Sequence, residues 1–151
     1  MKANGVVIRK TEMAVLAVLC ALAVAQGQAV AANSLVDRGN GIVEEVPAGR
    51  MWAKQRSFSI RSPEEAQAYA ERLGLGGYTD WRLPTPQELY DLHYLVDIKK
   101  AKGIAMKMEG NYWLVDQEGT GMAGSWEVGD QCEPSRSYFK KEWGYVRAVR
   151  P

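Results

Sequence analysis

The feature that most constrains this chain is a pair of helix-start signals separated by a glycine-rich stretch. Residues 62–65 (Ser-Pro-Glu-Glu) and 85–88 (Thr-Pro-Gln-Glu) each place a hydroxyl residue at the N-cap, proline at the first helical position and glutamate three residues after the cap. Apolar residues then recur at helical spacing, as Ala66, Tyr69, Ala70 and Leu73 after the first signal and as Leu89, Leu92 and Val96 after the second. The sequence therefore predicts two short helices.

Strand-like segments lie on both sides of the helical region. Ile42–Val46 and Arg50–Lys54 flank a Pro-Ala-Gly turn and predict a β-hairpin. Further segments rich in aromatic and β-branched residues follow the helices, at 112–115, 125–128, 137–139 and 145–150. The last alternates, with Tyr145, Arg147 and Val149 expected on one face. The predicted order is therefore a strand hairpin, two helices and then several strands.

Two charged loops carry further expectations. In the turn-rich stretch 76–84, Asp80 and Arg82 are expected to hydrogen-bond to the loop backbone, because amides and carbonyls in loops need partners. The segment 99–107 carries several lysines and is expected to be an exposed basic loop.

The amino terminus has the pattern of a signal peptide. Basic residues precede an apolar run at 13–25, and Ala29-Val30-Ala31 forms an A-x-A cleavage site. The run is too short to cross a bilayer. We expect residues 1–31 to be cleaved, leaving one domain over 32–151 with no stable membrane span, exported to the periplasm or the extracellular space. Cys132 would then be the remaining thiol, either buried as a small hydrophobe or joined to a second chain in a homo-oligomer.

Composition excludes several function classes. The formal net charge of +1 gives no basic field for a phosphate backbone, so we expect no nucleic-acid partner. The single histidine, His93, lies beside the apolar stripe of the second predicted helix, and no nucleophile motif accompanies it, so we expect no catalytic residue. One histidine and isolated cysteines form no zinc site, and the loop acids match no calcium-loop spacing, although oxygen ligands for calcium are present. We therefore expect no metal or cofactor.

Aromatic and charged residues concentrate between 111 and 143. Such side chains can stack on and hydrogen-bond to a sugar or peptide, although rings on short strands often belong to the core. The candidate ligand-binding residues are Trp113, Asp116, Trp126, Arg136, Tyr138, Lys140 and Trp143.

Several motifs resemble the Lcl C-terminal domain family, across about residues 36 to 151. The most specific is Gly76-Gly77-Tyr78-Thr79-Asp80-Trp81-Arg82-Leu83-Pro84, joined by Gly49–Trp52, Tyr112-Trp113 and Tyr145–Arg150. The resemblance implies a C-type-lectin-like α+β fold, distantly akin to formylglycine-generating enzymes. The terminal strands are expected to pair, and two short helices to flank a small, mainly antiparallel sheet with long loops, which agrees with the predicted order of elements. The paired cysteines with which those enzymes bind copper have no counterpart in this chain.

The resemblance also implies a function. The adhesin for which the family is named uses this domain for extracellular attachment, including to sulfated polysaccharide. We therefore expect an exported, non-enzymatic domain that binds a glycan or protein ligand through aromatic-rich loops. The alternative is a structural or assembly subunit of a cell-envelope complex, joined to its partners through Cys132 or the aromatic patch.

Overall fold

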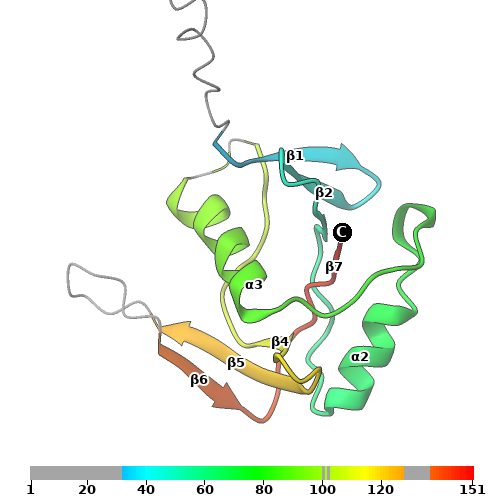
Figure 1. The fold of residues 1–151 in the computed structure, drawn as a ribbon, viewed down its shortest axis with the longest axis vertical. Coiled ribbons are helices and arrows are strands. Elements are labelled where there is room, and N and C mark those ends of the chain that lie inside the picture. Colours follow the sequence, from blue (N-terminus) through cyan, green and yellow to red (C-terminus); the bar gives the residue numbers. More distant parts are fainter. Residues whose placement is uncertain (1–31, 100, 102, 128–136) are drawn as a thin grey trace, which may run out of the picture. The chain divides into compact units, whose positions relative to one another are not determined.

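The structure is a computed structural model that describes residues 32–99, 101, 103–127 and 137–151. Within these residues the chain forms two α-helices and two small antiparallel sheets, which confirms the predicted α+β class (Figure 1). The C-type-lectin-like relationship stays a prediction. No helix among the described residues has the length and apolar character that a bilayer span requires.

The first sheet holds the predicted hairpin. Its strand order is β1 (Ser34–Gly39), β2 (Ile42–Val46), β3 (Met51–Ala53) and β7 (Val149–Arg150). The hairpin of β2 and β3 is antiparallel, as predicted. The C-terminal strand pairs with β3, not with the N-terminal β1, so the two terminal strands share a sheet without being neighbours.

Strand β1 was not predicted, because residues 33–41 are mostly polar. It is the exposed edge of the sheet, so polar side chains on it cost little. The turn to β2 runs through Gly39, Asn40 and Gly41, all with positive φ (75°, 50° and 76°). An Asn-Gly pair is a hairpin signal, and Asn40-Gly41 was the local indication of this strand that the polar composition concealed.

Both predicted helices are confirmed. Helix α2 (Pro63–Glu71) begins at Ser62, whose side chain accepts a hydrogen bond from the amide of Glu65, and buries Ala66 and Ala70. A 3-10 turn η1 (Leu75–Gly77) follows. Helix α3 (Pro86–His93) has a complete capping box between Thr85 and Glu88, and continues into a π-helical turn η2 (Tyr94–Ile98).

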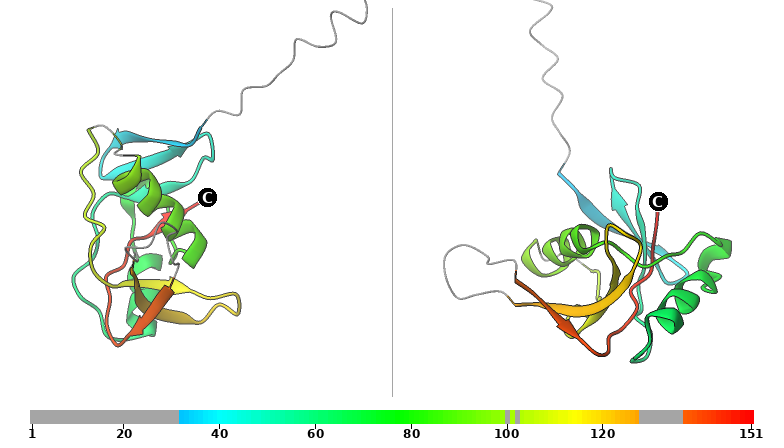
Figure 2. Two further views of the ribbon diagram at one scale, coloured as in Figure 1. Left: turned by 90° about the vertical axis from the view of Figure 1, so that its left-hand side faces the viewer. Right: turned by 60° about the horizontal axis from the view of Figure 1, so that its bottom comes forward.

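The second sheet follows the helices and has the order β4 (Tyr112–Val115), β5 (Gly121–Glu127) and β6 (Ser137–Lys141), all antiparallel. Figures 1 and 2 show the β1–β2 hairpin and the β5–β6 pair at opposite ends of the domain, with α3 between them and α2 on the other side of the C-terminal strand. Helix α3 and its extension therefore lie alongside segments of both sheets.

The C-terminal segment differs from the alternating strand that was predicted. Val146, Arg147, Ala148 and Val149 are all buried, at 1%, 1%, 0% and 0% exposure. An alternating pattern assumes that one face meets water, whereas this segment is enclosed by two apolar clusters, one holding Val146 and Ala148 and the other Val149. The alternation therefore does not separate a buried face from an exposed one, and of the predicted strand 145–150 only Val149–Arg150 forms β7.

The charged loops differ in part from expectation. Asp80 accepts two hydrogen bonds from the guanidinium of Arg150 at 2.7 and 2.9 Å, so its partner is a side chain and not the loop backbone. Arg82 does donate to the carbonyl of Leu83 at 3.1 Å, but also pairs with Glu88. The segment 99–107 exposes Lys99 and Lys107, as expected.

Candidate functional site

A groove with mostly apolar walls and hydrogen-bonding groups along its length runs along the solvent-facing side of α3 and η2. It consists of two adjoining cavities of about 460 and 500 Å³ that share Gln87 and Tyr90. The first is lined by Thr85, Pro86, Gln87, Tyr90, Val115, Asp116 and Gln117. The second is lined by Ala32, Asn33, Glu45, Gln87, Tyr90, Asp91, Tyr94, Leu95 and Lys99. We call the two together the α3 groove.

The helix itself explains which side chains enter the groove. Leu89 and Leu92 are 3% and 0% exposed and fix α3 to the core. Gln87, Tyr90, Asp91 and Tyr94 follow at i, i+3, i+4 and i+7, so they share a second face of the helix. Burial of one stripe therefore turns a continuous row of amide, phenol and carboxylate groups toward solvent.

The helix start is held by a partly buried ionic contact. Arg82 donates two hydrogen bonds to the carboxylate of Glu88, at 2.8 and 2.7 Å, and the amide of Thr85 donates to the same carboxylate at 2.9 Å. Burial alone would raise the pKa of Glu88, but these hydrogen bonds outweigh it and lower the pKa to about 2. Glu88 is therefore a fixed anion that holds the first turn of α3 in place.

One end of the groove rests on a buried carboxylate. Glu45 is 0% exposed, and it accepts hydrogen bonds from Arg50 at 2.8 and 3.0 Å and from Asn33 at 3.0 Å. Arg50 also reaches Asp91 on α3, at 3.2 Å. Burial would lower the pKa of Arg50, but its two carboxylate partners raise it overall. Arg50 thus bridges the hairpin and the helix across this end.

The other end is formed by the turn between β4 and β5. A carboxylate oxygen of Asp116 accepts hydrogen bonds from the amides of Glu118 at 2.9 Å and Thr120 at 2.8 Å. This arrangement orders the turn, which places Val115, Asp116 and Gln117 along the first cavity. The turn is therefore part of the groove wall.

The π-helical turn shapes the far end of α3. The amide of Lys99 donates to the carbonyl of Tyr94 at 3.0 Å, five residues back. The ammonium of Lys99 lies 5.7 Å from the centre of the Tyr94 ring, and that side chain is exposed. Short π-helical turns occur often at functional sites, because they re-aim side chains at the end of a helix.

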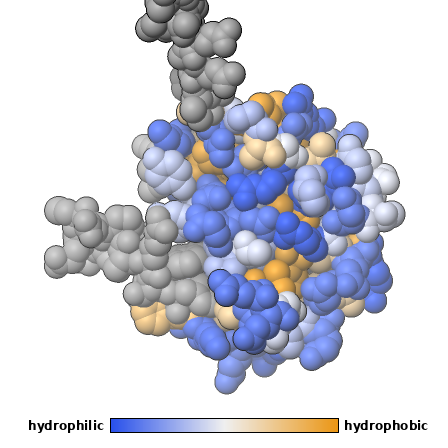
Figure 3. Space-filling model, viewed as in Figure 1, coloured by the Kyte–Doolittle hydropathy of each residue, from blue (hydrophilic) through white to orange (hydrophobic). Residues whose placement is uncertain are grey.

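The groove offers hydrogen-bonding groups and aromatic surface together. Its amides, phenols and carboxylates come from Asn33, Gln87, Tyr90, Asp91, Tyr94, Asp116 and Gln117. Figure 3 shows the face carrying α3 as largely hydrophilic, with hydrophobic surface confined to small areas. Mostly apolar walls with hydrogen-bonding groups along them suit an extended ligand that has both apolar and polar faces.

The predicted ligand-binding residues do not form one site. Asp116 lines the α3 groove. Lys140 is exposed on β6, and Trp143 is half-buried, with its ring 5.6 Å from that of Tyr145 in an edge-to-face contact. Arg136 lies outside the described residues. Trp126 and Tyr138 pair in register across β5 and β6.

Trp113 corrects the sequence prediction. It is 4% exposed, belongs to the core cluster around Trp81, and its indole N–H donates to the carbonyl of Ile60 at 3.1 Å. Its neighbours on β4, Tyr112 and Leu114, belong to the other core cluster, so both faces of this strand are buried. The aromatic composition of the segment could not reveal this. Trp113 therefore stabilises the fold and presents no face to a ligand.

The sequence prediction missed the tyrosines and glutamine of α3. The apolar stripe identifies the helix and its buried face, but it does not indicate which residues line a groove on the other face. The sequence did contain a signal for this face. Gln87, Tyr90 and Tyr94 recur at helical spacing on the side away from the apolar stripe, where two tyrosines indicate a binding surface more readily than a core.

His93 lies beside an acidic side chain of the following helical turn. The imidazole Nε2 of His93 lies 3.2 Å from the carboxylate of Asp97, one helical turn away. Among the residues that the structure describes, no three His, Cys, Asp or Glu side chains gather as metal ligands would. Cys132 and the predicted signal peptide lie outside the described residues.

Comparison with known proteins places the chain in a family. No curated protein and no solved structure matches it. The sequence model of the Lcl C-terminal domain matches residues 41–150, which include both helices and three strands of the first sheet, β2, β3 and β7. This confirms the resemblance drawn from the Gly-Gly-Tyr-Thr-Asp-Trp-Arg-Leu-Pro block. The chain belongs to the Lcl C-terminal domain family.

Proposed function

We propose that this protein is an exported, non-enzymatic binding domain that holds a glycan chain in the α3 groove. The observation that carries the proposal is the row of Gln87, Tyr90, Asp91 and Tyr94 along two joined cavities. Export rests on the signal-peptide pattern of residues 1–31. The family membership is consistent with a role in attachment.

The side chains of the groove suit sugar recognition. Planar amide and carboxylate groups bind pairs of sugar hydroxyls, while tyrosine rings cover the apolar C–H face of a pyranose. The groove combines these groups along its length, with Asn33 and Lys99 in one cavity and Asp116 and Gln117 in the other. A chain of sugar units can therefore contact several residues at once, although each contact is weak.

Binding explains the carboxylates of the groove better than catalysis does. Asp91 accepts hydrogen bonds from Gln87 at 2.6 Å and Arg50 at 3.2 Å. Asp116 is engaged by the amides of its own turn. Both carboxylates are therefore engaged by the protein's own donors, which holds them as fixed acceptors along the groove wall.

A glycan array tests the proposal. The full chain is applied with calcium and again with a chelator, together with two matched variants. Gln87→Ala removes an exposed side chain shared by both cavities, which donates to Asp91 four residues on. Gln67→Ala removes the equivalent donor to Glu71 on α2, at 2.7 Å, away from the groove.

We expect a glycan signal that survives the chelator, falls about threefold to tenfold in Gln87→Ala, and is unchanged in Gln67→Ala. Equal signals for both variants would place the binding surface elsewhere. No signal under either condition would contradict glycan binding, and the protein-ligand and assembly-subunit alternatives would then be tested by cross-linking of the full chain.

A further inference from the structure

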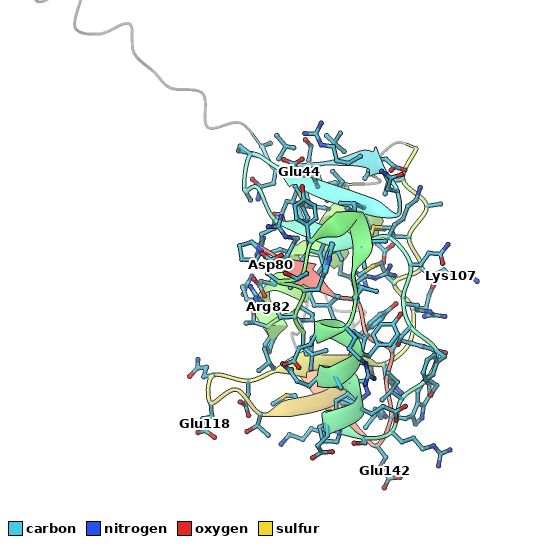
Figure 4. The ribbon with its side chains drawn as sticks, turned by 90° about the vertical axis from the view of Figure 1, so that its right-hand side faces the viewer. Glu44, Asp80, Arg82, Lys107, Glu118 and Glu142 are labelled. Atoms are coloured by element: carbon cyan, nitrogen blue, oxygen red, sulfur yellow. The ribbon has the colours of Figure 1, made fainter. Side chains whose placement is uncertain are left out.

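A second cavity, separate from the α3 groove, is lined by cations. Its volume is about 300 Å³, and its lining residues are Lys54, Gln55, Arg56, Ala105, Lys107 and Arg147. Four of these six side chains are cationic and none is acidic. Figure 4 shows Lys107 on the opposite side of the domain from Arg82 and from Glu118, which lies next to the β4–β5 turn of the groove. We call this second cavity the basic pocket.

Arg147 supplies a buried charge at the basic pocket. It is 1% exposed, and it donates hydrogen bonds to the carbonyls of Ala53, Lys54 and Lys107. Its Nε is buried without a hydrogen-bond partner. In the part of the chain that the structure describes, no carboxylate forms an ion pair with it, and burial lowers the pKa of Arg147. The charge is therefore stabilised by neutral groups, namely these carbonyls and Tyr112, whose ring centre lies 5.9 Å from the guanidinium.

Arg56 is held in place at the same pocket. Its guanidinium lies 3.8 Å from the centre of the Tyr145 ring and donates to the carbonyl of Glu109. Tyr145 is in turn contacted by the edge of the Trp143 ring, at 5.6 Å. The ring contact and the hydrogen bond to a carbonyl fix the orientation of the Arg56 side chain. Because the side chain is already ordered, it loses less conformational entropy when it binds a ligand.

The two lysines differ in their partners. Lys54 forms an ion pair with Asp37 at 2.5 Å. Lys107 is exposed, and its ammonium has no ion-pair partner among the described residues. Asp37 balances one of the four cations, so the pocket keeps an excess of positive charge.

We propose that the basic pocket binds a single oxyanion group of a small or chain-end ligand, held by Arg56 and Lys107 over the buried guanidinium of Arg147. An anion there reduces the repulsion among like charges that are brought together by folding. It also accepts charge-assisted hydrogen bonds from a pre-oriented guanidinium.

The size of the pocket limits the ligand to one charged group and its immediate carrier. A volume of about 300 Å³ is at the lower end for small-molecule sites. A carboxylate on a sugar and a phosphate group share the required chemistry, namely negative oxygens that accept several N–H donors. The two sources differ in charge and shape and can be separated by titration.

Amide-resolved NMR titration of the full chain tests this site with three probes at constant ionic strength: inorganic phosphate, glucuronate and, as the uncharged counterpart, glucose. Lys107→Gln removes one cation while leaving the carbonyl of residue 107 to accept from Arg147 and Tyr112. Lys141→Gln makes the same charge change at an exposed residue of β6 that does not line the pocket.

We expect saturable shifts at amides 54–56 and 105–107 with phosphate or glucuronate and none with glucose. Affinity should fall about threefold to tenfold in Lys107→Gln and stay unchanged in Lys141→Gln. Saturation by phosphate alone would identify a tetrahedral oxyanion, and saturation by glucuronate alone a carboxylate. Linear shifts, shifts spread over the surface, or equal affinities in the two variants would overturn the proposal, whether or not the α3 groove binds a glycan.

Discussion

The guanidinium of Arg82 forms two hydrogen bonds with the carboxylate of Glu88, six residues on, at 2.8 and 2.7 Å. This contact joins the loop before α3 to the first turn of the helix that carries the groove. Because Glu88 also closes the capping box with Thr85, one carboxylate fixes the helix start by two routes. The position of the groove therefore depends on a short segment of the Gly-Gly-Tyr-Thr-Asp-Trp-Arg-Leu-Pro block.

Removing Arg82 should destabilise the domain. Arg82→Ala leaves a Glu88 side chain that is only 14% exposed without its main partner, and we expect the free energy of unfolding to fall by about 2 kcal/mol. Arg38→Ala is the control, because Arg38 is 51% exposed in its pair with Glu44 and should change stability by less than about 0.5 kcal/mol. Urea denaturation measures both, and equal losses would contradict the account.

Stability should depend on pH through Glu88. Its pKa is about 2 in the folded protein against 4.5 for the free side chain. A lowered folded-state pKa stabilises the fold fully above pH 4.5, and that contribution is lost as the pH falls toward 2. We expect a loss on the order of 2 kcal/mol over this window, reduced in Glu88→Gln. Urea denaturation at stepped pH values gives the comparison, and a Glu88→Gln protein with the wild-type pH slope would refute the assignment.

Two adjacent glycines should differ in their tolerance of a methyl group. Both glycines have positive φ, 66° at Gly76 and 79° at Gly77. A Cβ added at Gly76 would lie 2.3 Å from Cδ1 of the buried Ile42, whereas a Cβ added at Gly77 would meet no atom within 4 Å. We expect Gly77→Ala to cost about 1 kcal/mol from backbone strain, and Gly76→Ala about 2 kcal/mol because Ile42 must also repack. Thermal unfolding should give a lower melting temperature for Gly76→Ala than for Gly77→Ala. Equal melting temperatures would contradict the predicted clash with Ile42.

Arg147 should stabilise the fold in addition to supplying positive charge to the basic pocket. Arg147→Met keeps apolar bulk but removes the donors to the carbonyls of Ala53, Lys54 and Lys107. Carbonyl groups buried without partners are costly, so we expect a loss of about 2–4 kcal/mol in urea denaturation. A Met variant as stable as the wild type would mean that the carbonyls find other donors.

Local signals in the sequence predicted the elements well, and contacts between distant residues explain the failures. The caps at Ser62 and Thr85 determine where the helices begin, because N-cap chemistry acts over four residues. The partner of Asp80 is Arg150, which lies 70 positions away, so no local pattern could identify it.

The candidate site was harder to predict for the same reason. Asp116 was identified from composition, but Trp113, three residues earlier, is core, and only the packing of β4 separates their roles. The basic pocket depends on Arg147, Arg56 and Lys107, which come from three distant segments. Their proximity is a property of the fold, and their spacing in the sequence gives no indication of it.

The most direct test of glycan binding in the α3 groove is the array signal of Tyr94→Ala relative to Phe58→Ala. Each variant truncates an exposed aromatic ring, 41% exposed at Tyr94 in the groove and 63% exposed at Phe58 outside it. The account predicts that Tyr94→Ala lowers the glycan signal about tenfold while Phe58→Ala leaves it unchanged. A Tyr94→Ala protein that binds glycans as the wild type does would contradict it.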